Sequence, residues 1–419
     1  DMISPNTINS WDKWFNATMM EKFEKIVLNQ SDYLQNISSI ITETSLSDWK
    51  IYFKWALLNR NASLLNSEFE KQNFYFYRTV LSGVEEMEPR WKRGVSLVSG
   101  RLGEIIGKVY VEKHFDQKAK NRMLELVENL REAYRISIEE LDWMGDSTKV
   151  QAQEKLKKFR PKVGFPNDWK DYSNLVISKD DLIGNIKNST LDRTIKNREK
   201  LGKPIDREEW GMTPQTVNAY YSPLLNEIVF PAGILQPPFF NMEADDAVNY
   251  GAIGAVIGHE MGHGFDDKGS KYDGNGELRN WWTESDRKQF EERTKKLIDQ
   301  YNGYTVVDGT PVNGEFTQGE NIGDLAGIVI AYKAYQLSKK GSKAPIIDGL
   351  TGDQRFFFGW ATIWGSKSTD EQLIRQIKTD PHSPGEFRAN GPLVSMPEFV
   401  NLYNVKPVSY THLRAHETS

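Results

Sequence analysis

The segment that most constrains the fold of this chain is AVIGHEMGHGFDD, residues 255–267, in which two histidines lie four positions apart within an apolar stretch. An α-helix places residues four apart on the same face, so His259 and His263 would direct two imidazole nitrogens at one point. Glu260 would then lie beside a metal ion and could take a proton from a metal-bound water. The pattern predicts a helix that carries two ligands and the general base of a zinc site. The alternative is a helix with two hydrogen-bonded histidines and an exposed glutamate.

A catalytic zinc ion needs a third protein ligand and an open position for water. The chain has 6 histidines and no cysteine, so thiolate ligands and disulfides are excluded. The histidines outside the segment are His114, His382, His412 and His416, and none follows it at a short spacing. Glu320 and Asp324 in GENIGD are four apart on a second predicted helix, so one carboxylate could bind the metal while the other supports a histidine. Taken alone, such a pair is more often a solvated helix face.

The charge and hydropathy of the chain exclude two classes of protein. The formal net charge is -5, and Lys and Arg are spread along the 419 residues. There is therefore no basic surface for nucleic acid. No apolar run reaches the roughly 18 residues that a membrane-spanning helix needs. We expect neither nucleic acid as a partner nor a membrane span in this sequence.

Hydrophobic periodicity predicts a mainly helical protein with a small β-sheet. Residues 11–159 have apolar positions every three to four residues, which is typical of packed helices. Proline and glycine punctuate residues 161–214 and indicate a loop-rich connection into a second domain. The segment TVNAYYSPLLNEIVFPAG, residues 216–233, predicts two short strands in a hairpin. Further helices are predicted at 247–263, 319–337 and 353–364.

Several segments resemble, in order, the motifs of the neprilysin-type zinc endopeptidases, which include endothelin-converting enzymes and bacterial oligoendopeptidases. They are VNAYY (217–221), NEIVFPAGILQPPFF (226–240), VIGHEMGHGFDD (256–267), WWT (281–283), GENIGDLAG (319–327) and KTDPHSPGEFR (378–388). Earlier helices, such as those in EPRWKRGVSLVSGRLGEIIGKVYVEKHF, are similar to the second lobe of that family. The resemblance implies an α+β, two-lobed zincin of the gluzincin type, whose thermolysin-like catalytic domain and helical lobe enclose a cavity.

The resemblance implies one zinc ion per chain, bound by His259, His263 and Glu320, with Glu260 as the general base. The implied activity is hydrolysis of small to medium peptides, with a preference for a hydrophobic residue on the amino side of the cut. A competing hypothesis is a binding or adhesion protein that keeps a peptidase fold without turnover. Such a protein would normally lack a ligand or the base, and neither is missing here.

Other residue roles are likewise implied by the resemblance. Asp324 would orient the first ligand histidine and Asp266 the second, each by accepting the ring N–H that faces away from the metal. His382 would donate to the oxyanion that forms during catalysis, and Arg388 would bind carbonyl or carboxylate groups of the substrate. Asn218 and Ala219 would hydrogen-bond the backbone of an extended peptide. An apolar pocket for the residue after the cut would be lined by Ile234, Phe239, Val256 and Trp364.

The resemblance also sets expectations for domains and location. We expect an N-terminally incomplete helical lobe at 1–205, a catalytic domain at 206–407 and a non-native tail at 408–419, which excludes His412 and His416 from the site. Because animal members are rich in disulfides, the absence of cysteine favours a bacterial protein. We expect it to be a monomer located outside the cytoplasm, in the periplasm or at the cell surface.

Overall fold

The computed structural model describes residues 15–18, 20 and 30–406 of the 419-residue chain. The chain divides into two compact units. The first comprises the residues up to 80 together with 173–205, and the second comprises residues 81–172 together with those from 206 onward. Within the described ranges, no helix is both long and apolar enough to cross a membrane. The predicted tail at 408–419 lies outside the described residues.

The described part of the first unit is built from helices. They are α2 (Ser31–Glu43), α3 (Leu46–Asn61), α4 (Ser67–Phe74) and α9 (Leu182–Arg198), with a 3-10 turn at Ala62–Leu64 and a π-helical turn at Tyr75–Val80. The side chains of Ser45, Asn66 and Asp181 each accept a backbone N–H from the first turn of the helix that follows. These are preferred N-cap residues, so local sequence determines where three of these helices begin.

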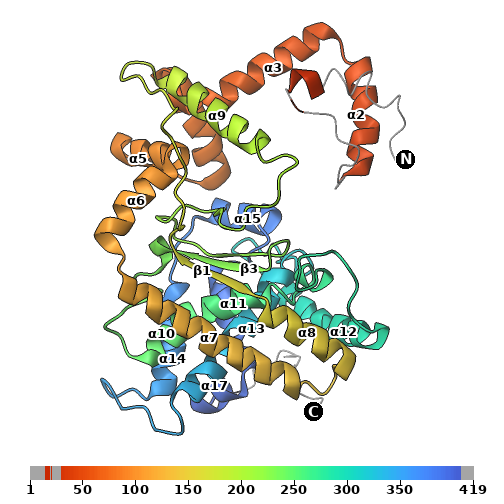
Figure 1. The fold of residues 1–419 in the computed structure, drawn as a ribbon, viewed down its shortest axis with the longest axis vertical. Coiled ribbons are helices and arrows are strands. Elements are labelled where there is room, and N and C mark those ends of the chain that lie inside the picture. Colours follow the sequence, from red (N-terminus) through yellow and green to blue (C-terminus); the bar gives the residue numbers. More distant parts are fainter. Residues whose placement is uncertain (1–14, 19, 21–29, 407–419) are drawn as a thin grey trace. The chain divides into compact units, whose positions relative to one another are not determined.

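The second unit contains the remaining labelled helices (Figure 1) and the motif segments between residues 217 and 388. Its helices are α5 (Arg90–Arg101), α6 (Gly103–His114), α7 (Gln117–Glu140), α8 (Asp146–Lys157), α10 (Asp246–Asn249), α11 (Ala255–Gly262), α12 (Glu284–Asn302), α13 (Gln318–Ser338), α14 (Gly352–Ile363), α15 (Asp370–Thr379), α16 (Gly385–Asn390) and α17 (Pro397–Leu402). A π-helical turn at Tyr250–Gly254 joins α10 to α11. The helices predicted at 247–263, 319–337 and 353–364 are therefore confirmed.

A three-stranded sheet contains β1 (Arg160–Gly164), β2 (Tyr220–Ser222) and β3 (Glu227–Pro231) in the order β1-β3-β2. β2 and β3 pair antiparallel, which confirms the predicted hairpin, and β1 runs parallel to β3. The prediction of a loop-rich connection at 161–214 was wrong for β1 and for α9, which is a helix at Leu182–Arg198. Pro161 is tolerated there because β1 is an edge strand, where a missing N–H need not break a ladder. α11 packs against β2 and β3, and α7 packs against β1.

The close approach of α11 to α13 positions the candidate metal site. A Cβ atom on Gly258 would lie 2.7 Å from the carbonyl oxygen of Gly327, and one on Gly327 would lie 2.5 Å from that of Ala255. Any larger residue at either position would force the two helix backbones apart. The core around this crossing is apolar and includes the fully buried side chains of Ile257 and Ile328.

The prediction of a mainly helical fold with a small β-sheet is confirmed. The division into a helical lobe at 1–205 and a catalytic domain at 206–407 stays a prediction. The two compact units divide the chain in another way, because residues 81–172 belong to the unit that contains the second half of the chain.

Candidate metal centre

Three potential metal ligands converge where α11 crosses α13. His259 lies in the last turn of α11, His263 caps its end, and Glu320 lies in the first turn of α13. The two Nε2 atoms lie 3.2 and 3.7 Å from the two carboxylate oxygens of Glu320, and one ligand atom of each residue lies within 4.8 Å of the others. Two ligands of a tetrahedral zinc ion lie about 3.3 Å apart, given metal–ligand bonds of about 2.0 Å. The spacing of these side chains therefore fits one zinc ion.

Each of these histidines has a carboxylate behind its other ring nitrogen. His263 Nδ1 is hydrogen-bonded to Asp266 Oδ2 at 2.7 Å, and His259 Nδ1 lies 2.8 Å from Asp324 Oδ1. A carboxylate at Nδ1 favours the tautomer with its proton on Nδ1, which leaves Nε2 free for a metal. The structure thus places Asp266 and Asp324 where they can orient the two rings.

The two carboxylates have different further partners. Asp266 Oδ1 accepts the backbone N–H groups of Lys268 and Gly269, at 2.8 and 2.6 Å. Asp324 is 1% exposed and accepts two N–H groups of Arg388, both at 2.7 Å. The guanidinium carbon of Arg388 also lies 4.2 Å from the ring centroid of Trp364. Arg388, which the resemblance assigns to the substrate, therefore also neutralises the carboxylate behind His259.

The charges around the ligands favour a bound cation. Burial works against ionisation of Glu320, but the imidazoles of His259 and His382 hold its pKa well below the ordinary value. Burial likewise lowers the pKa of His259, yet the carboxylates of Asp324 and Glu320 raise it to about 10. Glu320 Oε2 is buried and lies 3.2 Å from both imidazoles without the alignment of a hydrogen bond. In the metal-free site, a proton on His259 supplies positive charge that a bound metal ion would supply instead.

Glu260, the predicted general base, lies in an environment that raises its pKa. Its side chain is buried, and burial raises its pKa while the adjacent His259 and His263 oppose that shift. Its Oε2 atom has no hydrogen-bond partner. A carboxylate with a raised pKa and a free oxygen is a stronger proton acceptor than an ordinary exposed carboxylate.

His382 lies in the loop between α15 and α16. Its backbone N–H and its Nδ1 both meet Asp380 Oδ1, at 2.9 and 2.6 Å, and its Nε2 lies 3.2 Å from Glu320 Oε2. The contact with Glu320 raises the pKa of His382, and burial opposes this. Carboxylates beside both ring nitrogens favour the imidazolium, which carries a proton on each nitrogen. The sequence analysis missed Asp380, although its place two residues before His382 in KTDPHSPGEFR was an available signal.

A cavity of about 440 Å³ opens onto these groups. It is lined by every predicted site residue apart from Asp266: Asn218, Ala219, Ile234, Phe239, Val256, His259, Glu260, His263, Glu320, Asp324, Trp364, His382 and Arg388. The sequence analysis did not predict the other lining residues: Met212, Val217, Tyr220, Tyr221, Ala255, Trp360 and Ile363. The tyrosines follow Asn218 and Ala219 in VNAYY, but nothing in the sequence separates lining residues from core there. The individual roles of the predicted residues stay predictions.

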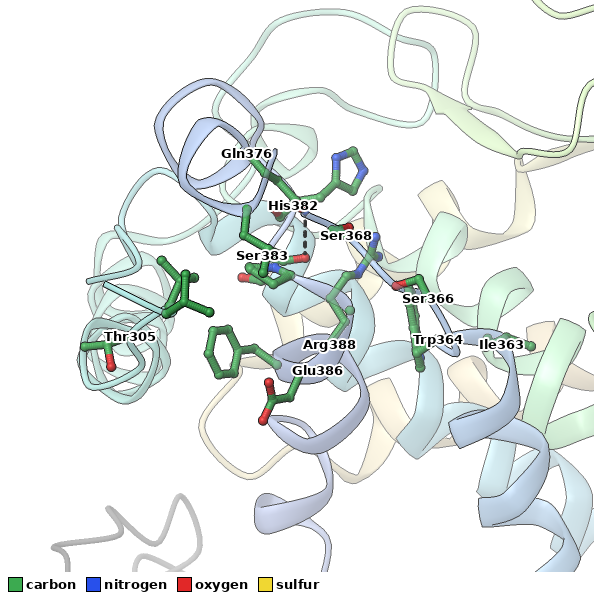
Figure 2. A pocket seen from close by; sticks show the side chains of 16 residues that line it. Thr305, Ile363, Trp364, Ser366, Ser368, Gln376, His382, Ser383, Glu386 and Arg388 are labelled. Atoms are coloured by element: carbon green, nitrogen blue, oxygen red, sulfur yellow. Dashed lines mark hydrogen bonds between the residues drawn. The ribbon is translucent and has the colours of Figure 1, made fainter. Parts of the chain in front are cut away.

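A second cavity, of about 590 Å³, adjoins the first and shares Ile363, Trp364, His382 and Arg388 with it (Figure 2). Its other walls come from residues 305–307, the segment after α14, α15 and the first turn of α16. Figure 2 shows Arg388 beside Trp364, with His382, Ser383 and Gln376 grouped together above them. Arg388 and His382 therefore lie at the boundary between the two cavities.

Comparison with known proteins gives a consistent result. Two family models described as Peptidase family M13 match the chain, one at residues 218–418 and the other at residues 3–166. Neprilysin-11 of Caenorhabditis elegans is 40% identical over 395 residues, which cover 90% of this chain and 46% of that protein. Endothelin-converting enzyme 1 of Homo sapiens is 36% identical over 410 residues, which cover 94% of this chain and 52% of that protein.

Among solved structures, the chain is similar to the zinc metalloprotease ZMP1 of Mycobacterium tuberculosis in complex with an inhibitor. The TM-score is 0.92 at 51% sequence identity, over 95% of this chain and 61% of the other. The chain spans about half the length of the curated relatives that it matches.

Proposed function

The chain belongs to peptidase family M13, and from this premise we propose that it is a zinc-dependent endopeptidase of small to medium peptides. The observation that carries the proposal is the meeting of His259, His263 and Glu320 beside Glu260 on the wall of one cavity. A helix with two merely hydrogen-bonded histidines would need neither a carboxylate that faces both Nε2 atoms nor an adjacent glutamate with a buried, unpartnered oxygen.

Each of several side chains around the site would have its own role in peptide hydrolysis. When bound to the two histidines and Glu320, zinc would supply a Lewis acid and lower the pKa of the attacking water. Glu260 would take the proton from that water and return it to the leaving nitrogen, which suits a carboxylate whose pKa burial has raised. His382, held at Nδ1 by Asp380, would donate from Nε2 to the oxygen on which negative charge develops.

The substrate would be held by groups on the same cavity wall. Arg388 would bind a carbonyl or carboxylate oxygen of the peptide with the N–H groups that Asp324 leaves free. Asn218 and Ala219 lie beside the strand β2 and would hydrogen-bond an extended peptide backbone. The apolar side chains of Ile234, Phe239, Val256 and Trp364 line the same cavity and would receive the residue after the cut.

Replacing Glu260 with glutamine tests the proposal. The variant should bind zinc as the wild type does yet lose cleavage of a quenched hydrophobic peptide, since an amide cannot accept the proton. Glu398→Gln, an exposed position on α17, is the matched control and should keep wild-type turnover. Cleavage by Glu260→Gln at the wild-type rate would contradict the assignment of the base.

Metal analysis of the wild type with and without chelator separates the competing functions. Zinc together with chelator-sensitive cleavage supports the peptidase. Zinc without cleavage would favour a binding protein on a peptidase fold, and absence of zinc would favour a metal-free helical protein. We expect one zinc ion per chain, a monomer in solution and a location outside the bacterial cytoplasm. Metal-to-protein ratio, light scattering and fractionation of the source cells test these expectations.

A further inference from the structure

The loop that carries His382 is joined to the helix that carries Glu320 by a buried hydrogen bond. Ser383, which follows His382, donates its hydroxyl to Asn321 Oδ1 at 2.8 Å, and Asn321 follows Glu320. Ser383 is 1% exposed and Asn321 is 0% exposed. The bond therefore connects the two residues adjacent to the candidate oxyanion donor and the candidate metal ligand.

Further hydrogen bonds fix the orientation of both partners. Asn321 Nδ2 donates to Thr317 Oγ1 at 2.9 Å, which directs the amide oxygen of Asn321 toward Ser383. Gln376 on α15 donates to the backbone carbonyls of His382 and Ser383, at 3.2 and 3.4 Å. Figure 2 shows Gln376, His382 and Ser383 close together at the edge of the second cavity. The loop is thus held by Gln376 from α15 and by Asn321 from α13.

We propose that Asn321 and Ser383 are positioning residues that set the place of His382 relative to the metal ligand Glu320. This inference rests on the peptidase function proposed above. The side chain of His382 is 44% exposed, so packing alone does not hold it. Asp380 holds the His382 ring by a hydrogen bond within the loop, and Gln376 connects the backbone of His382 to α15. Ser383 connects the loop to α13, the helix that carries the metal ligand.

The geometry predicts which kinetic constant should change. Removing the Ser383 hydroxyl leaves Asn321 Oδ1 buried without a donor, which favours a shift of the loop or entry of water. A donor to developing charge works only within hydrogen-bond reach of the place where that charge forms. Because His382 would act when the charge develops, the loss should fall on kcat and leave KM nearly unchanged.

The first test compares Ser383→Ala with the control Thr379→Ala. Thr379 is exposed at the end of α15 and donates its hydroxyl to Arg375 O of its own helix, at 2.9 Å. We expect Ser383→Ala to lower kcat on a quenched peptide by about tenfold to a hundredfold. KM, zinc content and Tm should stay close to those of the wild type, and Thr379→Ala should match the wild type throughout. Binding of a phosphonamidate peptide, which imitates the tetrahedral transition state, should weaken by the same factor as kcat.

The second test repeats Ser383→Ala, and Asn321→Ala from the other side of the bond, in a His382→Ala background. If both residues act through His382, each substitution should lower kcat by no more than about twofold in this background. The reason is that the effects of substituting residues that act as a unit are not additive. An equal loss in both backgrounds would overturn the proposal, as would a loss confined to KM or Tm. A wild type without chelator-sensitive cleavage would instead contradict the peptidase function itself.

Discussion

The two candidate ligand histidines lie one helical turn apart, yet the carboxylates behind them are held in different ways. Asp266 is three residues after His263, and its second oxygen accepts backbone N–H groups of the turn that follows α11. Asp324 comes from another helix, and Arg388 from α16 binds both of its oxygens. One support is therefore local to a single turn, and the other joins α11, α13 and α16.

This difference matters because only the long-range support reaches the cavities where we propose that substrate binds. Arg388 lines both cavities and lies over the ring of Trp364. A change at Asp324 would therefore disturb the metal site and the proposed substrate clamp together. A change at Asp266 would reach the metal only through His263.

Replacing Asp324 with alanine should give the largest effect. Zinc affinity should fall by about a hundredfold, the upper end for loss of a group behind a metal ligand. The free energy of unfolding should fall by about 3–5 kcal/mol, because Arg388 is left buried without its partner. Competition with a chelator and urea unfolding of the metal-free protein measure the two quantities. Wild-type values for both would show that Asp324 does not support the site.

Asp266→Asn should have a smaller effect and separates the two supports. The amide oxygen of asparagine can still accept the backbone N–H groups of Lys268 and Gly269, but its NH2 group cannot accept from His263. Zinc affinity should therefore fall by about tenfold, while the free energy of unfolding changes by no more than about 1 kcal/mol. If this variant unfolds as easily as Asp324→Ala, the distinction between a local and a long-range support is wrong.

The local half of the site was predictable from the sequence. His259, Glu260 and His263 lie within five residues, and helical geometry alone places two of them on one face. The same argument linked Glu320 to Asp324 on α13. The segments at 247–263 and 319–337 were predicted correctly as helices because their apolar periods are long and regular.

The rest depends on contacts between segments that are far apart in the sequence. β1 was missed because its partner β3 is more than sixty residues away in the sequence. In addition, Pro161 is a typical loop residue, although an edge strand tolerates it. The contact of Arg388 with Asp324 was missed because nothing in KTDPHSPGEFR shows that Asp324 would accept two of its N–H groups. The glycine contact between α11 and α13 also escaped prediction, since its partner atoms are backbone atoms.

Arg388→Lys tests whether the long-range support can be divided into its two roles. Lysine keeps the positive charge beside Asp324 but cannot donate to both oxygens in a fork or lie flat on Trp364. Zinc affinity should change by no more than about threefold, whereas kcat/KM should fall by about tenfold through loss of the clamp. Titration with zinc and steady-state kinetics on one peptide measure the two effects. A fall in zinc affinity as large as in Asp324→Ala would mean that the two roles cannot be separated, because the metal site then needs the guanidinium fork itself.

The smallest expected effect is the number of protons released when zinc binds. Asp324 and Glu320 raise the pKa of His259 to about 10 in the metal-free site, against the effect of burial, so its imidazole is protonated at pH 7. Zinc binds the neutral ring, so it must displace that proton, and zinc affinity should rise with pH up to this pKa.

Asp324→Asn should release fewer protons than the wild type, because one of the carboxylates that raise the pKa of His259 is gone. Asp266→Asn should release as many as the wild type, because the pair of His259 and Asp324 is intact. Calorimetry in buffers of different ionisation enthalpy counts these protons, and equal release by the two variants would contradict the difference between the supports.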